Sequence, residues 1–293
     1  MTKQTIKEIK AQIIHSLAEL YQKKEAESIA NRVIEDVMKT DPLEETKTHV
    51  PEAERKTMLD IYLKRLLNSE PVQYVTGCAY FRNLKLKVNP HVLIPRSETE
   101  FLVEEVLNHF QNRKDILFGL DIGTGTACIP VSLETESNHI VMEAMDNSQL
   151  AIMVAKENTA FYKTKTKLLV DDILNPEYTK YRMGKYDFIV SNPPYVLVSD
   201  KAKMHENVLN YEPAEALYVP DGQALLFYNA ILNFADKKLK NKGWLFLEIH
   251  EEKGEELHKL LQERNYYPVK IIQDLNNKDR FIKAMKRDSV RSG

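Results

Sequence analysis

A chain of 293 residues with 43% hydrophobic content is long enough to bury one sizeable α/β core and to add a small second domain. The net charge of -2 and the pI near 6.5 exclude an overall basic field, the usual companion of non-specific nucleic-acid binding, although a local basic patch stays open. The two cysteines, Cys78 and Cys128, have no Cys or His neighbours at ligand spacing, so neither a disulfide framework nor a metal site is expected.

The N-terminal ten residues contain no apolar signal core, and no stretch reaches the roughly 18 apolar residues that span a bilayer. We therefore expect a cytoplasmic protein that makes no membrane contact.

Residues 1–72 show the pattern of a small helical bundle, because apolar residues recur at helical spacing. They are Ile6, Ile9, Ile13, Leu17 and Leu20, then Ile29, Val33 and Val37, then Leu59, Leu63 and Leu66. The pairs Asp41-Pro42 and Val50-Pro51 interrupt the pattern, and Glu70-Pro71 ends it, because proline disfavours helix at the residue before it.

Residues 73–95 are expected to form a β-hairpin linker, since Leu84 to Val88 alternate between apolar and polar. From 96 to 293 strands and helices alternate, which predicts an α/β domain with a mostly parallel sheet covered on both faces. Strands are expected at 116–122, 139–145, 167–170, 186–190, 244–249, 269–272 and 280–284, and helices at 101–110, 128–134, 149–161, 223–239 and 252–264.

A glycine pair follows the first of these strands, in Asp121-Ile-Gly-Thr-Gly-Thr-Ala127, and a helix follows the pair. Glycine at such a turn lets the backbone pass close to a ligand. The third glycine of a dinucleotide fingerprint would fall at Cys128, so the pyrophosphate motif is incomplete. A nucleoside cofactor without that group, such as S-adenosylmethionine, fits better; a tight turn with no ligand is the alternative.

Acidic residues follow the next two strands. Asp146 lies about 20 residues beyond the glycine loop, where a carboxylate can accept both ribose hydroxyls, or can cap the following helix. Of Asp171 and Asp172, the second is favoured, with Ile173, to meet adenine; a solvated turn or a helix cap explains the pair equally well.

The most specific motif is Asn192-Pro193-Pro194-Tyr195, at the C-terminal end of an apolar strand, where open α/β sheets bind ligands. The prolines stiffen the loop and remove two N–H donors, so the loop presents mainly acceptors. We expect the Asn192 side-chain oxygen and the Pro193 carbonyl to accept both hydrogens of a planar NH₂ group, with Tyr195 packed on its flat face. The alternative is a rigid turn that ends the strand and binds no ligand. It would explain the two prolines but not Asn192 and Tyr195 beside them.

At this point the chain resembles the bacterial glutamine-N5 methyltransferases that modify class-one peptide-chain release factors. The resemblance covers essentially the whole chain and rests on several segments. They are Pro71 to Gly77, Val92 to Glu100, the glycine loop, Asn192 to Tyr195, Tyr211 to Pro213 with Ala216-Leu217, and Asp274-Leu275 with Arg280. The family more often has glycine at the position of Ala127 and proline at that of Ser97.

The resemblance implies a Rossmann-like methyltransferase domain with a seven-stranded sheet, preceded by a helical domain that recognises the substrate and by the hairpin linker. The implied reaction is methyl transfer from S-adenosylmethionine to the glutamine of a release factor's Gly-Gly-Gln loop. Matching positions give Gly123, Thr124, Gly125, Thr126, Ala127, Asp146 and Asn192 as cofactor contacts, and Asn192, Pro193, Pro194 and Tyr195 as contacts of the glutamine amide.

Two competing functions share these motifs. An adenine-N6 methyltransferase would use the same loop on a flipped base, but it would need a basic groove that the sequence does not display. A non-catalytic binding module would keep the fold without transfer, against which the intact loop from Asn192 to Tyr195 argues. We expect release factors as partners, no stable nucleic-acid binding, and a monomer.

Overall fold

A computed structural model describes residues 6–38, 52–182, 184–274 and 276–288. The predicted helix breaks at Asp41-Pro42 and Val50-Pro51, and Leu275 of the resemblance, lie outside these ranges. The chain divides into two compact units, Met1–Cys78 with Met204–Tyr211, and Ala79–Lys203 with Glu212–Gly293. No helix in the described ranges is long and apolar enough to cross a membrane.

The first unit is helical, as the apolar spacing predicts. Its helices are α1 (Ile6–Leu17), α2 (Lys23–Val37), α3 (Glu52–Leu67), α4 (Val72–Thr76) and α8 (Glu206–Tyr211). Ile13, Leu17, Val33 and Leu66 are fully buried and join one core. The short helix α4 was not predicted, because it is a single turn confined between Pro71 and the left-handed Gly77.

The second unit is built on a seven-stranded sheet with strand order β10-β11-β9-β6-β3-β4-β5. The strands are β3 (Leu117–Ile122), β4 (Ile140–Asp146), β5 (Lys167–Val170), β6 (Tyr186–Ser191), β9 (Leu239–Glu248), β10 (Tyr266–Gln273) and β11 (Asp279–Lys286). β9, β6, β3, β4 and β5 pair in parallel, and β11 runs antiparallel to both of its neighbours. All seven expected strands are therefore confirmed, with β9 beginning five residues earlier than expected.

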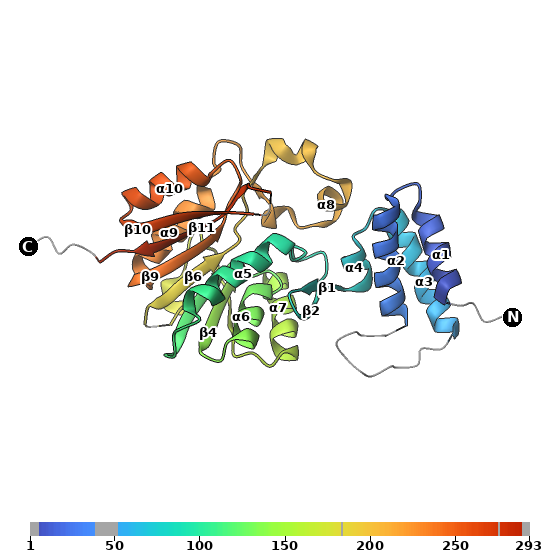
Figure 1. Cartoon of the computed structure of the whole chain (residues 1–293), viewed down its shortest axis with the longest axis horizontal. Coiled ribbons are helices and arrows are strands. Elements are labelled where there is room, and N and C mark those ends of the chain that lie inside the picture. Colours follow the sequence, from blue (N-terminus) through green and yellow to red (C-terminus); the bar gives the residue numbers. More distant parts are fainter. Residues whose placement is uncertain (1–5, 39–51, 183, 275, 289–293) are drawn as a thin grey trace, which may run out of the picture. The chain divides into compact units, whose positions relative to one another are not determined.

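Helices pack on both faces of this sheet, as expected (Figure 1). They are α5 (Ser97–Phe110), α6 (Cys128–Glu136), α7 (Gln149–Phe161), α9 (Leu226–Lys238) and α10 (Gly254–Glu263). Alternate residues of β6 point to opposite faces, so Phe188 and Val190 join the core under α5 and α6, while Ile189 joins the core under α9 and α10. Both faces of the central strands are thus buried, which explains their continuous apolar sequence.

Residues 73–95 contain the expected hairpin, β1 (Cys78–Phe81) and β2 (Leu84–Lys87). The apolar residues Phe81, Leu84 and Leu86 belong to the core of the second unit. Asn158 of α7 holds β2 in place, since it accepts from the Lys87 amide at 2.7 Å and donates to the Lys87 carbonyl at 3.0 Å. The short elements are β7 (Val196–Leu197), which pairs with β8 (Tyr218–Val219), and the 3₁₀ helices Tyr178–Lys180, Val198–Lys203 and Ala214–Ala216.

Gly119 in the middle of β3 provides a test of core packing. A β-carbon at this position would overlap the ring of Phe188 and the sulfur of Met142, both of which are fully buried. Gly119→Ala should lower the free energy of unfolding by about 1–3 kcal/mol, because the core cannot expand without strain. Urea denaturation measures the loss. In the matched control Gly184→Ala, the added carbon meets only the Arg182 side chain at 3.4 Å, and wild-type stability is expected. Equal stability of both variants would contradict this account of the core.

Candidate functional site

The carboxyl ends of β3, β4 and β6 meet at one edge of the sheet, because the three strands are parallel and in register. A pocket opens there, as expected for an open α/β sheet. Its lining comprises His91, Val92, Leu93, Ile122, Gly123, Gly125, Met145, Asp146, Asn147, Ser148, Ala151, Asp171, Asp172, Ile173, Ser191, Asn192, Pro193, Pro194, Pro213, Glu215, Ala216, Phe227 and Ile231. Both motifs singled out in the sequence therefore contribute to one cavity.

The segment Asp121 to Ala127 lines the pocket through Ile122, Gly123 and Gly125. Gly123 and Gly125 have φ values of 76° and 52°, in the left-handed region that favours glycine. The N–H groups of Gly123 and Thr124 both donate to the Met145 carbonyl at 2.9 Å, which ties the loop to the end of β4. The other predicted contacts, Thr124, Thr126 and Ala127, are buried and are not among the lining residues. Their role as cofactor contacts stays a prediction.

Ala127 precedes α6 with a φ of 63°. The left-handed conformation costs a non-glycine residue on the order of 1–2 kcal/mol. This explains in physical terms why glycine suits the position, and the burial of the Ala127 methyl group in the core under α6 offsets part of the strain.

Asp146 lines the pocket at the end of β4. Its Oδ2 accepts from the Gly125 amide at 2.9 Å and its Oδ1 from the Ser148 amide at 3.0 Å. Burial raises the pKa of Asp146, and these two amides partly offset that effect. The cap of α7 is Ser148, whose Oγ accepts from the Ala151 amide at 3.2 Å, so helix capping does not account for Asp146. Each carboxylate oxygen keeps a second lone pair for a ribose hydroxyl.

Part of the pocket lining is apolar. Ile173 and Ile231 of α9 line the pocket and belong to one core cluster, against which the lining residue Phe227 packs, and Asp172 also lines the pocket. Asp171 is held by its own chain, since its Oδ2 accepts from the Tyr181 hydroxyl at 2.7 Å and from the Glu177 amide at 2.9 Å. Sequence reasoning missed Phe227, because it lies inside a helix and belongs to no motif. Its ring offers the aromatic surface that the motifs lacked.

The loop after β6 contributes Asn192, Pro193 and Pro194 to the lining. Tyr195 is not among the lining residues, and its hydroxyl instead donates to Oε1 of Glu248 at 3.0 Å. The Asn192 side chain donates through Nδ2 to Oγ1 of Thr99 at 3.1 Å, and the Thr99 hydroxyl donates to Oε2 of Glu248 at 2.8 Å. Packing of the Tyr195 ring on a substrate stays a prediction.

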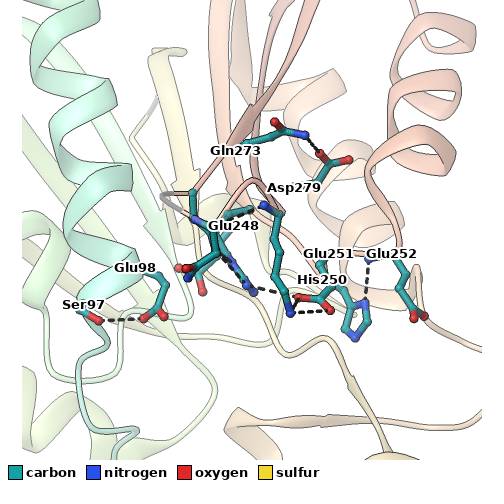
Figure 2. Close-up of polar contacts among 12 residues, drawn as sticks. Ser97, Glu98, Glu248, His250, Glu251, Glu252, Gln273 and Asp279 are labelled. Carbon is teal, nitrogen blue, oxygen red and sulfur yellow. Dashed lines mark hydrogen bonds and ion pairs between the residues drawn. The ribbon is translucent and has the colours of Figure 1, made fainter.

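Glu248 ends β9, and its side chain is 1% exposed. Burial raises the pKa of Glu248 to about 7, although the Thr99 and Tyr195 hydroxyls stabilise the carboxylate. Figure 2 shows Glu98 of α5 on one side of Glu248 and the segment from His250 to Glu252 on the other. Thr99 lies within the Val92 to Glu100 segment of the resemblance, which assigned it no role, and Glu248, a single Glu in a strand, matches no motif.

An ion pair with a buried carboxylate lies next to Val92 and Leu93 in the chain and fixes this part of the pocket lining. Arg96 donates to Oε1 of Glu212 at 2.7 Å, and the Ile94 amide donates to Oε2 at 3.1 Å. The Glu212 side chain is only 1% exposed, whereas that of Arg96 is 33% exposed. The ion pair thereby joins the chain before α5 to the chain that leads to the lining residue Pro213.

A buried carboxyl group adjoins the pocket lining in the sequence. Asp121 lies directly before the lining residues Ile122 and Gly123, is fully buried, and receives no hydrogen bond of ordinary geometry from the described residues. Burial raises the pKa of Asp121 to about 7, more than the nearby Thr124 hydroxyl lowers it. A buried carboxyl group without a partner suits a cationic ligand. Asp121 is not itself a lining residue; the lining combines the acidic Asp146 and Asp172 with the apolar Ile173, Phe227 and Ile231, a composition that suits a nucleoside.

Comparison with known proteins agrees with this geometry. Residues 97–242 match the family model described as "Methyltransferase small domain". The release factor glutamine methyltransferase of Bacteroides thetaiotaomicron is 32% identical over 94% of this chain and 98% of its own length. That of Lactococcus lactis is 39% identical over 75% of this chain and 78% of its own length.

Among solved structures, the hMettl16 catalytic domain in complex with MAT2A 3'UTR hairpin 6 is similar, with a TM-score of 0.55 and 19% sequence identity. The likeness covers 76% of this chain and 84% of that chain. At this identity it shows the shared fold alone, which agrees with the Rossmann-like methyltransferase fold predicted from the sequence.

Asp146 provides a test of the cofactor pocket. Asp146→Asn should weaken S-adenosylmethionine binding about 10-fold or more, because the variant loses the charge and sets an NH₂ group against one of two backbone N–H donors. Isothermal titration calorimetry measures the dissociation constant. Asp115→Asn is the control, since Asp115 is exposed and paired only with Arg113 at 2.6 Å. Wild-type affinity in folded Asp146→Asn protein would remove Asp146 from the binding site.

Proposed function

Because the chain belongs to the family of release factor glutamine methyltransferases, we propose that its substrate is the glutamine of the Gly-Gly-Gln loop in a class-one peptide-chain release factor. The chain is an S-adenosylmethionine-dependent protein-glutamine methyltransferase. The product carries the methyl group on the side-chain amide nitrogen. Release factors act in the cytosol, so we propose that the enzyme works there.

The observation that carries this proposal is the state of the Asn192 side chain. Its Nδ2 donates to Thr99 at 3.1 Å, which turns the amide so that Oδ1 is free to accept from a ligand in the pocket. Pro193 adds a carbonyl and has no N–H of its own. The loop therefore offers two acceptors to a planar NH₂ group with two hydrogens, which is the chemistry of a glutamine amide.

A carboxamide nitrogen is a weak nucleophile, because its lone pair is delocalised into the carbonyl group. Acceptance of its hydrogens by Asn192 and Pro193 orients the nitrogen and localises electron density on it, so positioning supplies most of the catalysis. S-adenosylmethionine, when bound, supplies an electrophilic methyl group on a sulfonium. Gly123, Gly125, Asp146, Asp172, Ile173 and Phe227 are the residues that would hold it. The nitrogen–methyl bond would form as the sulfonium–methyl bond breaks, so that S-adenosylhomocysteine is left as a neutral thioether and one amide hydrogen leaves as a proton.

Three further expectations stay proposals. We assign substrate recognition to the helical unit within residues 1–72, and we expect a monomer without stable nucleic-acid binding. The adenine-N6 reaction remains the alternative, because a flipped adenine also presents a planar NH₂ group to such a loop.

The proposed function is tested by transfer of a labelled methyl group to three acceptors. They are a purified release factor, the same factor with its loop glutamine changed to alanine, and duplex DNA. Label on the intact factor alone supports the proposal. Label on DNA supports adenine methylation, and equal label on both forms of the factor would point to another residue.

Asn192 gives a sharper test of the mechanism. Asn192→Ala should fold normally and lose at least about 100-fold in transfer rate, because one preorganised polar contact to the reacting group disappears. Single-turnover transfer to the release factor measures the loss. The control is Asn108→Ala on α5, where the exposed side chain bonds only to Glu104 at 3.2 Å. Turnover of Asn192→Ala within a few-fold of wild type would refute the proposed role of the amide.

A further inference from the structure

We propose that Thr99 and Glu248 are positioning residues that fix the rotation of the Asn192 side-chain amide, so that its oxygen and not its nitrogen faces the substrate. The inference rests on the proposed function, because it assumes that the substrate brings N–H donors to Asn192. It concerns two residues outside the pocket lining, on α5 and β9, that act through Asn192.

The rotation follows from the single hydrogen of the Thr99 hydroxyl. An ionised carboxylate only accepts hydrogen bonds, so the 2.8 Å contact from Thr99 to Oε2 of Glu248 uses that hydrogen. Oγ1 of Thr99 then has only lone pairs for its second neighbour. Asn192, at 3.1 Å, must therefore present its NH₂ group to Thr99. Rotation of the Asn192 amide by half a turn would place its Oδ1 against Oγ1 of Thr99, with no hydrogen between the two oxygens.

The other oxygen of Glu248 is also occupied, which keeps the carboxylate from turning. Oε1 accepts from the Tyr195 hydroxyl at 3.0 Å. Tyr195 and Asn192 belong to the same loop, so one carboxylate holds both ends of the Asn-Pro-Pro-Tyr motif, directly through Tyr195 and through Thr99 at Asn192. Thr99 is 3% exposed and Glu248 is 1% exposed, so water does not readily replace either contact.

Several features argue that this carboxylate serves orientation. Thr99 and Glu248 lie on a helix and a strand, whose backbones are fixed independently of the loop. A buried carboxylate costs desolvation energy, and among the described residues no cation forms an ion pair with Glu248, since Arg280 bonds to Asp274 at 3.2 Å instead. Glu248 instead accepts from two neutral hydroxyl groups, those of Thr99 and Tyr195. Tyr195 belongs to the catalytic loop, and Thr99 bonds to Asn192 of the same loop.

The same hydrogen-bond chain predicts a dependence on pH. A protonated Glu248 can donate, which frees the Thr99 hydroxyl to donate to Asn192 and removes the constraint on the amide. Burial raises the pKa of Glu248 to about 7, so transfer should decline as pH falls through that region. The titratable groups around Glu248 are Glu98 of α5, Cys128 of α6, Tyr195, Tyr228 of α9 and Arg280 of β11. The pKa values of Cys128, Tyr195 and Tyr228 are raised, so these groups stay neutral near pH 7.

Four variants test the inference through the transfer rate. Thr99→Val keeps the shape of the side chain and removes the hydroxyl, and kcat should fall about 10- to 100-fold. Thr99→Ser restores the hydroxyl and should recover activity to within about threefold of wild type. Glu248→Gln exchanges one carboxylate oxygen for an NH₂ group, which Thr99 or Tyr195 can accept from, so the constraint on Thr99 is weakened and kcat should fall to between those of wild type and Thr99→Val. Ser97→Ala is the matched control, since its exposed hydroxyl on the same helix bonds only to Glu98 at 3.0 Å (Figure 2).

Two readouts separate orientation from a merely structural role. S-adenosylmethionine affinity, measured by calorimetry, should stay within about threefold of wild type in Thr99→Val, because Thr99 does not line the pocket.

The second readout is the decline of the transfer rate at low pH. This decline should be present in wild type and Thr99→Ser, and absent from Thr99→Val and Glu248→Gln. Wild-type kcat in Thr99→Val, or a Thr99→Ser variant as slow as Thr99→Val, would overturn the inference. If Thr99→Val does not fold, Thr99→Ala, which also removes the hydroxyl, decides in the same way.

A measurement without substrate separates this inference from the proposed function. The NMR signal of the Asn192 side-chain NH₂, identified by its loss in Asn192→Ala, should show slowed hydrogen exchange in wild type and fast exchange in Thr99→Val. Fast exchange in wild type would refute the inference even if glutamine is the substrate. Slow exchange with no transfer to a release factor would instead refute the proposed substrate and leave the orientation of Asn192 supported.

Discussion

Parallel pairing of β3 with β4 on one side and β6 on the other is the constraint on which the site depends. The register aligns Ile122 with Met145 and with Ser191, so three chain segments leave the sheet at the same level. The glycine loop, Asp146 and Asn192 lie at the C-terminal ends of β3, β4 and β6, respectively. Residues about 70 positions apart in the sequence thus meet because backbone hydrogen bonds of the sheet position them, and the Gly125 amide adds a direct bond to Asp146.

The parts predicted from the sequence are those with local signals. Periodic apolar residues located all seven strands of the sheet and the major helices, and glycines or prolines after strands located the two loops of the pocket. The short helix α4 and the early start of β9 were missed, because a single turn or the first residues of a strand produce too little periodicity.

The side-chain contacts of the site could not be predicted in the same way. Tyr195 was expected beside the substrate as part of a motif, yet its hydroxyl is held by Glu248, a residue 53 positions away. Thr99 and Phe227 look ordinary in the sequence, since their importance depends on which neighbours the fold provides. A motif identifies the residues that meet a ligand more readily than the residues that hold the motif, because the second set comes from elements distant in the chain.

The antiparallel strand β11 has a consequence for the order in which the protein forms. It is the latest of the seven strands in the sequence, yet it lies inside the sheet between β10 and β9, and Phe281 pairs with Glu248. During synthesis on the ribosome, β9 therefore has an open edge until Asp279–Lys286 have emerged. Glu248 gains its neighbouring strand only then, so the catalytic loop reaches its final support at the last step of assembly of the sheet.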